Sequence, residues 1–170
     1  AGYQPLGAML CSEKIYNALE TGSGFFQHGH SYLGHPVATA AGLAVVKTLL
    51  DRDLINRSKL MGNKLQSLLI KKLGQHPFVG DIRGRGLFIG IELVENRDNK
   101  APFQTARGLA RKIKQTTFEA GLICYPMSGT RDGKLGDHVL LAPPFILEDK
   151  HIAEIIEKIS FGIDEAIAKN

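Results

Sequence analysis

Cysteine is scarce in this sequence. Its 170 residues include only Cys11 and Cys124, which lie far apart and form no Cys-x-x-Cys pair. Neither a disulfide framework nor a zinc ribbon is therefore expected, and a reducing cytoplasm is the expected compartment. Long apolar runs are missing too. No stretch approaches the roughly 20 residues of a membrane-spanning helix, and the first residues lack a signal-peptide pattern. We expect a soluble protein without a membrane partner.

A strong excess of one charge is also lacking. The chain has 21 basic and 17 acidic residues, and the resulting net charge of +4 is spread along it rather than gathered into a block. Arg83 and Arg85 flank a glycine, as in arginine-glycine RNA-binding segments. Such segments are repeated and disordered, whereas this pair stands between two apolar runs without an aromatic platform. We expect no nucleic-acid partner.

What is present is the composition of one globular unit with a real core, since 44% of the residues are hydrophobic and 22% are charged. Internal repeats and low-complexity tracts are absent. The first residue, Ala1, leads directly into a Gly/Pro-rich run without a methionine. We interpret the chain as cut from a longer one.

The first third of the sequence predicts a short strand followed by a helix over residues 9–20, and then a loop over residues 21–35. The loop holds four glycines and three histidines, a composition too polar to pack as a regular element. Pro36 suits the first turn of a helix, and the small residues that follow predict that this helix is buried against a neighbour. A further helix is expected over 54–73, where leucines form one apolar stripe and Gly74 supplies the stop.

The remainder predicts an antiparallel strand pair over 78–83 and 87–94, joined through Gly84, Arg85 and Gly86. A helix over 105–120, short strands over 122–125 and 139–142, and a last helix from about 148 follow. An isoleucine stripe marks the last helix. This order favours a layered α+β domain with helices on one face of a small sheet.

Four sequence blocks appear in order along the chain: Gly2-Tyr3-Gln4-Pro5-Leu6-Gly7-Ala8, residues 26–36 around His28-Gly29-His30-Ser31, residues 81–92 around Arg83-Gly84-Arg85-Gly86, and Ala142-Pro143-Pro144-Phe145. No block is decisive alone. Together, at compatible separations over essentially the whole chain, they closely resemble the class III aminotransferases.

The resemblance implies a parent enzyme with the fold of type I pyridoxal-phosphate-dependent transferases, an α/β fold in which a large domain holds pyridoxal 5'-phosphate and a smaller domain closes over it. Residues 1–50 would be the end of the large domain, and residues 51–170 the α+β C-terminal small domain. The family's Schiff-base lysine lies a few residues before the Gly-Tyr-x-Pro block, and so would precede Ala1. No catalytic residue is expected within the chain, and the chain alone is expected to be inactive.

The loop before Pro36 carries the expected cofactor contact. In the family, a threonine of this loop reaches across a homodimer to the cofactor phosphate of the other subunit, and Ser31 matches it. We assign His30 and Ser31 to cofactor binding, because a hydroxyl with adjoining loop N–H groups can cradle an anion. The alternatives are a serine that bonds its own backbone, and a metal site made by His28, His30 and His35. We expect no metal, since no carboxylate or cysteine lies beside these histidines.

The sequence indicates the substrate-binding residues less clearly than the cofactor contact. Family members that bind an amino-acid carboxylate often use a small-domain arginine, whose planar fork pairs both oxygens. The two positions where it stands correspond here to Tyr125 and Leu140. Arg131, in the loop between them, is a candidate replacement unless it is simply a solvated loop residue. Tyr125 and Arg131 are therefore the expected substrate-binding residues.

The resulting functional hypothesis is a transaminase that moves an amino group between a primary amine or ω-amino acid and a keto acid. Two alternatives remain. An aminomutase on the same fold would need the same lysine. A non-catalytic α+β dimerisation or regulatory module would use the loop over residues 21–36 as its binding surface.

Overall fold

The computed structural model describes residues 2 and 4–168, and it divides the chain into two units between Asp53 and Leu54. The first unit contains two helices, α1 over Glu13–Thr21 and α2 over Pro36–Asp51. Residues 9–12, expected to form a strand, are not one. A strand requires a neighbour for its backbone hydrogen bonds, and the described part of this unit contains no strand that could pair with them.

Helix α2 begins where the sequence predicts. Pro36 occupies its first turn, and the Nδ1 atom of His35 accepts a hydrogen bond from the Ala38 N–H at 3.4 Å. The prediction that this helix is buried is wrong within this unit, where Ala38 is its only buried residue and Leu43 is 58% exposed. The small residues of α2 are suited to close packing, but the described part of residues 1–53 provides almost nothing to pack on them.

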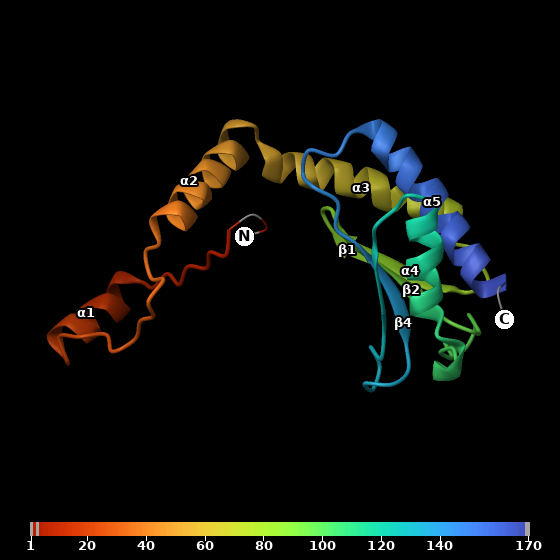
Figure 1. The fold of residues 1–170 in the computed structure, drawn as a ribbon, viewed down its shortest axis with the longest axis horizontal. Helices are drawn as coiled ribbons and strands as arrows, with labels where there is room; N and C mark the ends of the chain where they lie inside the picture. Colours follow the sequence, from red (N-terminus) through yellow and green to blue (C-terminus); the bar gives the residue numbers. More distant parts are fainter. Residues whose placement is uncertain (1, 3, 169–170) are drawn as a thin grey trace. The chain divides into compact units, whose positions relative to one another are not determined.

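The second unit is a layered α+β domain, as expected. Its sheet is antiparallel with strand order β1-β2-β4-β3, and helices α3, α4 and α5 cover one face (Figure 1). The elements, in chain order, are α3 (Leu54–Leu73), β1 (Val79–Arg85), β2 (Phe88–Leu93), the short 3₁₀ helix η1 (Thr105–Arg107), α4 (Leu109–Glu119), β3 (Tyr125–Ser128), β4 (Asp137–Leu141) and α5 (Asp149–Ala168).

The core of this unit lies between the sheet and its helices. Side chains alternate between the two faces of each strand, and those of β2 and β4 that point to the helices are almost completely buried. The isoleucines of α5 form the opposing stripe, as the sequence predicts. The central members of the core are Leu65, Leu69, Ile89, Ile91, Ile113, Val139, Ile152, Ile159 and Ile163.

Three predicted boundaries are wrong. The helix expected over 105–120 is interrupted at Gly108, whose φ of +58° separates η1 from α4. Strand β1 continues to Arg85, so the turn falls at Gly86. The strand expected over 122–125 begins only at Tyr125, because the Leu122 N–H bonds to the Thr117 carbonyl at the end of α4. Since β3 is an edge strand, it can contain Pro126 without losing a ladder hydrogen bond.

Among the residues that the structure describes, no helix combines the length and the apolar character that a membrane crossing requires.

Candidate functional site

Two hollows, one in each unit, are lined by His30 and Arg131, two of the residues expected to bind ligands. The hollow in the first unit has a volume of about 440 Å³ and lies between the segment around Pro5 and the loop that precedes α2. His30 and His35 line it, and Ser31 is the residue next to His30 in the loop. The structure thus places both predicted cofactor-binding residues at or beside one concave surface.

Ser31 is exposed, and its hydroxyl makes no hydrogen bond within the described residues. Residues 31–34 form a turn closed by the bonds Leu33 N–H to His30 O, at 3.0 Å, and His35 N–H to Tyr32 O, at 3.1 Å. This turn leads directly into α2, a 16-residue helix whose N-terminal end is favourable for an anion. The reading of Ser31 as a serine bonded to its own backbone is therefore not what the structure shows.

The three loop histidines have separate local contacts. His28 packs against the ring of Phe26, and His35 caps α2 and packs against Tyr32. Over residues 2 and 4–168, no three His, Cys, Asp or Glu side chains gather closely enough to hold a metal ion.

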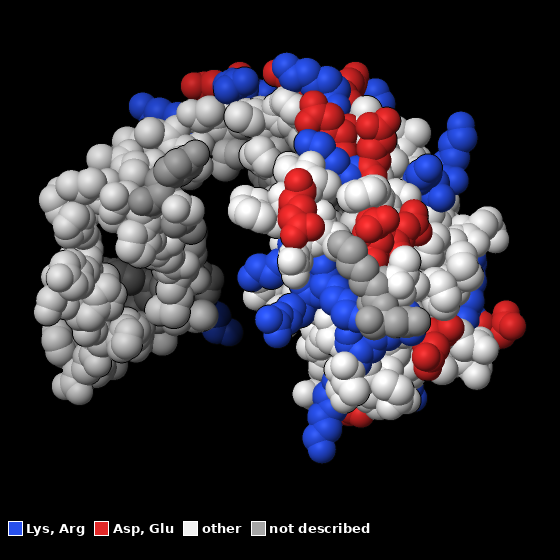
Figure 2. Space-filling model, turned by 45° about the vertical axis from the view of Figure 1, so that its right-hand side comes forward, with Lys and Arg blue, Asp and Glu red and all other residues white. Residues whose placement is uncertain are grey.

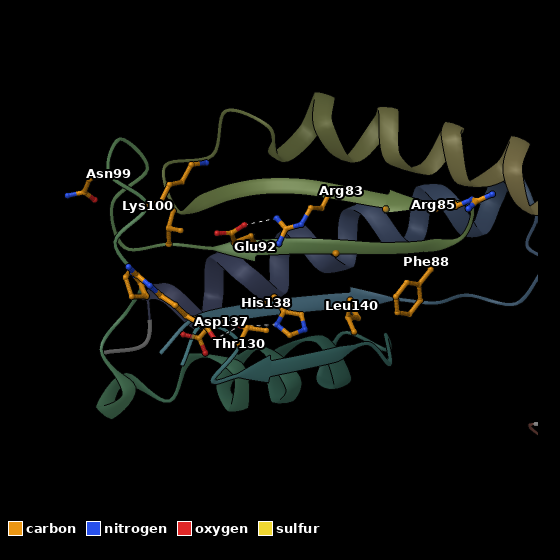
Figure 3. Close-up of a pocket in the computed structure, with 16 residues that line it drawn as sticks. Arg83, Arg85, Phe88, Glu92, Asn99, Lys100, Thr130, Asp137, His138 and Leu140 are labelled. Atoms are coloured by element: carbon orange, nitrogen blue, oxygen red, sulfur yellow. Dashed lines mark hydrogen bonds and ion pairs between the residues drawn. The ribbon is translucent and has the colours of Figure 1, made fainter. Parts of the chain in front are cut away.

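The larger hollow, of about 630 Å³, lies on the face of the sheet that no helix of the second unit covers (Figure 3). Gly90 forms part of its floor. The strand register places Gly90 between Arg83 of β1 and Leu140 of β4, so the absence of a side chain there opens a depression in the middle of the sheet. Phe88 and Leu140 provide apolar walls at one end.

Arg83 is fixed beside this floor by two carboxylates. Its Nη1 donates to Asp81 Oδ2 at 2.9 Å and to Glu92 Oε2 at 2.6 Å. These hydrogen bonds, the one to Glu92 first, raise the pKa of the Arg83 guanidinium. The three side chains belong to adjacent positions of β1 and β2, so the ion-pair cluster also ties the two strands together.

Arg131 reaches the same hollow from the turn between β3 and β4, and its guanidinium forms no hydrogen bond or ion pair among the described residues, although its charge acts on the neighbouring Asp132 carboxyl. His138 of β4 lies at the foot of that turn (Figure 3). Partial burial, and then the charge of Arg83, lower the pKa of His138, while Asp137 opposes the shift. The histidine is therefore biased toward its neutral form.

Of the two predicted substrate-binding residues, only Arg131 lines this hollow. Tyr125 lies at the other end of β3, paired with Leu140, and is 62% exposed. Sequence reasoning did not single out Glu92 or His138. Polar residues at alternate positions of β1, β2 and β4 were the available signal, because such alternation marks the face of a sheet turned away from the core.

Comparison with known proteins shows the family of the chain. The family model of class III aminotransferases matches residues 1–163. The chain belongs to the class III aminotransferase family.

Named relatives and solved structures agree with this family assignment. The chain is 38% identical to an aminotransferase of Gibberella zeae, in a match that covers 95% of this chain and 32% of the relative. It is 30% identical to the putrescine–pyruvate aminotransferase of Pseudomonas aeruginosa, in a match that covers 99% of this chain and 35% of the relative. A transaminase structure from the marine bacterium Virgibacillus superposes with a TM-score of 0.85 at 30% identity, covering 93% of this chain and 35% of that one.

The fold class implied by the sequence resemblance is thereby confirmed. A second structure, an (S)-enantioselective ω-transaminase from Thermomicrobium roseum, also superposes over 92% of the chain, with a TM-score of 0.82 and 27% identity. The chain spans about a third of the length of the curated relatives that it matches.

Proposed function

We propose that this chain supplies part of the cofactor and substrate sites of a pyridoxal-phosphate-dependent aminotransferase. The reaction moves an amino group between a primary amine or ω-amino acid and a keto acid. Membership of the class III family supports this reaction. The names of the putrescine–pyruvate aminotransferase of Pseudomonas aeruginosa and the probable gamma-aminobutyrate transaminase 3 of rice support the substrate class. When bound, pyridoxal 5'-phosphate accepts the amino group from the donor and delivers it to the keto acid.

The observation that carries the proposal is the unpartnered hydroxyl of Ser31 at the entrance to α2. A phosphate group requires hydrogen-bond donors and a positive local field. The Ser31 hydroxyl, the His30 ring and the N-terminal end of α2 are donors of this kind, so the residues present fit the phosphate of the cofactor. They would hold the phosphate and thereby orient the ring.

We further propose that Ser31 serves the cofactor of a second subunit in a homodimer. The exposed apolar residues beside it support an interface, since Tyr32 is 75% and Leu33 is 71% exposed. In this assignment residues 1–50 belong to the large cofactor-binding domain and residues 51–170 to the small domain. The division that the structure makes between Asp53 and Leu54 supports that boundary.

Arg131 is the proposed group for the keto-acid carboxylate. Its guanidinium forms no hydrogen bond or ion pair within the described residues, it stands at the rim of a hollow, and its planar fork suits the two oxygens of a carboxylate. Tyr125, also proposed for substrate binding, is exposed on the same face of the sheet and would contact the apolar part of the substrate rather than its charge.

The test uses the full gene product that carries this chain. Ser31→Ala should weaken its affinity for pyridoxal 5'-phosphate by about 10- to 100-fold, the loss of one hydrogen bond to a charged group, while Ser31→Thr keeps the hydroxyl and should retain affinity. Affinity is measured by titrating the apoprotein and following the cofactor absorbance. The proposal is wrong if Ser31→Ala binds as tightly as the wild type.

A further inference from the structure

The turn between β3 and β4, residues 129–136, is closed by its own hydrogen bonds. The Arg131 N–H donates to Leu135 O at 3.0 Å, and the Gly133 N–H donates to Gly129 O at 2.9 Å. Asp132 Oδ1 accepts from the Lys134 and Leu135 N–H groups at 2.9 and 2.7 Å. These bonds lower the pKa of the Asp132 carboxyl, the bond from Leu135 contributing most.

Glycines make the turn intrinsically soft. Gly129, Gly133 and Gly136 have φ values of +83°, +81° and +90°, a region that glycine enters at no steric cost and leaves as readily. Arg131 lies between the first two. A guanidinium carried by such a segment would be poorly positioned unless something fixed both ends of the turn.

Three side-chain hydrogen bonds fix the ends of the turn. At the base, Ser128 Oγ donates to Asp137 Oδ1 at 2.5 Å. Two residues after Ser128, the Thr130 hydroxyl lies 2.8 Å from Gly136 O and 3.3 Å from His138 Nδ1. Thr130, which directly precedes Arg131, thus connects this part of the turn to Gly136 and to His138 in the strand that follows the turn.

The hydroxyl has one proton, and a carbonyl oxygen can only accept it. The Thr130 hydroxyl therefore donates to Gly136 O, the shorter contact, and its oxygen accepts from His138. The proton of neutral His138 then resides on Nδ1, and Nε2 is left with a lone pair. Glu92 is the register partner of His138 on β2, Met127 is its partner on β3, and Arg83 and Asp137 are the other charges that act on it.

We propose that Thr130 and His138 are positioning residues for Arg131. His138 in its Nδ1–H tautomer donates to Thr130, Thr130 donates to Gly136, and this chain of bonds holds the glycine-rich turn in the one conformation that presents the Arg131 guanidinium at the hollow. The positioning role rests on the proposed function, in which Arg131 binds the keto-acid carboxylate. The proposed tautomer of His138 and the fixed conformation of the turn do not depend on whether Arg131 binds the carboxylate.

Nitrogen-15 NMR of the 170-residue chain tests the hydrogen bonds directly. The expected spectrum near pH 7.5 shows His138 with a protonated Nδ1 and an unprotonated Nε2. Thr130→Val, which keeps the shape and removes the hydroxyl, should abolish that tautomer preference and speed amide exchange of Arg131 by about tenfold, as the loss of about 1.4 kcal/mol would. Thr130→Ser is the matched control and should behave as wild type. A proton on Nε2 rather than on Nδ1 of His138 in the wild type would overturn the proposed direction of the hydrogen bond from His138 to Thr130.

Steady-state kinetics of the full gene product test the consequence. Thr130→Val should raise KM for the keto acid several-fold while kcat and KM for the amine stay near wild type, and Thr130→Ser should restore KM. Arg131→Ala is measured beside them. If Arg131→Ala raises the keto-acid KM and Thr130→Val does not, the positioning role is overturned and the proposed function stands. If Arg131→Ala has no effect on that KM, the carboxylate role of Arg131 and the positioning role both fail.

Discussion

Residues 1–53 and residues 54–170 place their apolar side chains very differently. In the second unit they fill a continuous core, with Ile89, Ile113 and Ile159 fully buried. In the described part of the first unit, only Ala38 is buried, and large apolar side chains such as Leu10, at 88%, and Phe25, at 66%, face outward. Exposed apolar side chains that form contiguous patches are typical of surfaces that other protein covers. The second unit therefore has a core of its own, whereas the described part of the first unit leaves most of its apolar side chains exposed.

The two units also differ in how many charged residues they contain. In the sequence up to Asp53 the charged residues are Glu13, Lys14, Glu20, Lys47, Asp51, Arg52 and Asp53. Figure 2 shows Lys and Arg side chains interspersed with Asp and Glu over the second unit on the face drawn. A mixed charged surface is typical of protein that faces water. The sparse charge of the first unit agrees with the interface that we propose for the loop around Ser31.

The largest expected difference between the units is the cost of deleting a leucine or isoleucine side chain. Ile159→Ala removes a fully buried side chain at the centre of the α5 stripe, and it should lower the free energy of unfolding by about 2–5 kcal/mol. Leu43→Ala in α2 should change it by less than about 0.5 kcal/mol, since Leu43 is exposed. Urea unfolding followed by circular dichroism measures both. Equal costs would mean that the two units share one core.

A glycine in each unit sharpens the comparison, because both stand inside a helix. At Gly62 of α3 an added Cβ would lie 2.1 Å from the backbone C and O atoms of Gly86, which cannot move without shifting the β1–β2 turn. At Gly42 of α2 the nearest atom would be Leu6 Cδ2, 2.3 Å away at the far end of a flexible side chain.

Gly62→Ala should therefore destabilise the chain by roughly 1–3 kcal/mol despite the better helix propensity of alanine. Gly42→Ala should instead increase the helical circular dichroism signal slightly, since the propensity gain of about 0.5–1 kcal/mol is not opposed by backbone. Thermal unfolding of the two variants separates these effects. A Gly62→Ala protein as stable as wild type would show that α3 is not held against Gly86.

The two units also differ in how much of them the sequence could predict. Helix α3 has its predicted bounds, and α5 begins within a residue of its predicted start, because each segment has its own apolar stripe and a local boundary signal, Gly74 after α3 and the carboxylates of Glu148 and Asp149 at the start of α5. The burial of α2 could not be predicted correctly, since the small residues of α2 indicate a partner without saying whether the chain contains it. The start of strand β3 was predicted three residues too early, because the Leu122 N–H bonds to the Thr117 carbonyl and pairing with β4 begins only at Tyr125.

The residues of the candidate sites also differ in how well the sequence predicts them. Ser31 and Arg131 could be selected because the surrounding blocks resemble a known family, whereas composition and periodicity pointed to neither. Thr130 gave no such signal, and for His138 the alternation of polar residues along β4 indicated only a position on the face turned away from the core. Their proposed role depends on the closing of one turn, which brings a hydroxyl within 2.8 Å of Gly136 O and within 3.3 Å of an imidazole nitrogen. Hydrogen bonds of this kind depend on backbone geometry that a sequence pattern does not contain.

The smallest expected effect is a difference in thiol reactivity, and each unit has one cysteine with which to measure it. Cys11 is exposed, whereas Cys124 packs against the core of the second unit and lies 3.4 Å from the Thr117 hydroxyl. Burial raises the pKa of the Cys124 thiol, and the contact with Thr117 only partly opposes the shift. Because the thiolate is the reactive form, Cys124 should be alkylated more slowly at pH 8, by about tenfold or more.

Iodoacetamide labelling of the native chain, followed by peptide mass spectrometry, gives both rates in one experiment. Labelling in urea is the control, since unfolding should bring the two rates close together. Ile159→Ala should speed labelling of Cys124 and leave that of Cys11 unchanged, because only Cys124 is protected by the core that this substitution weakens. If the native chain labels both thiols at the same rate, the second unit opens far more readily than its packing implies, and the contrast between the units does not hold in solution.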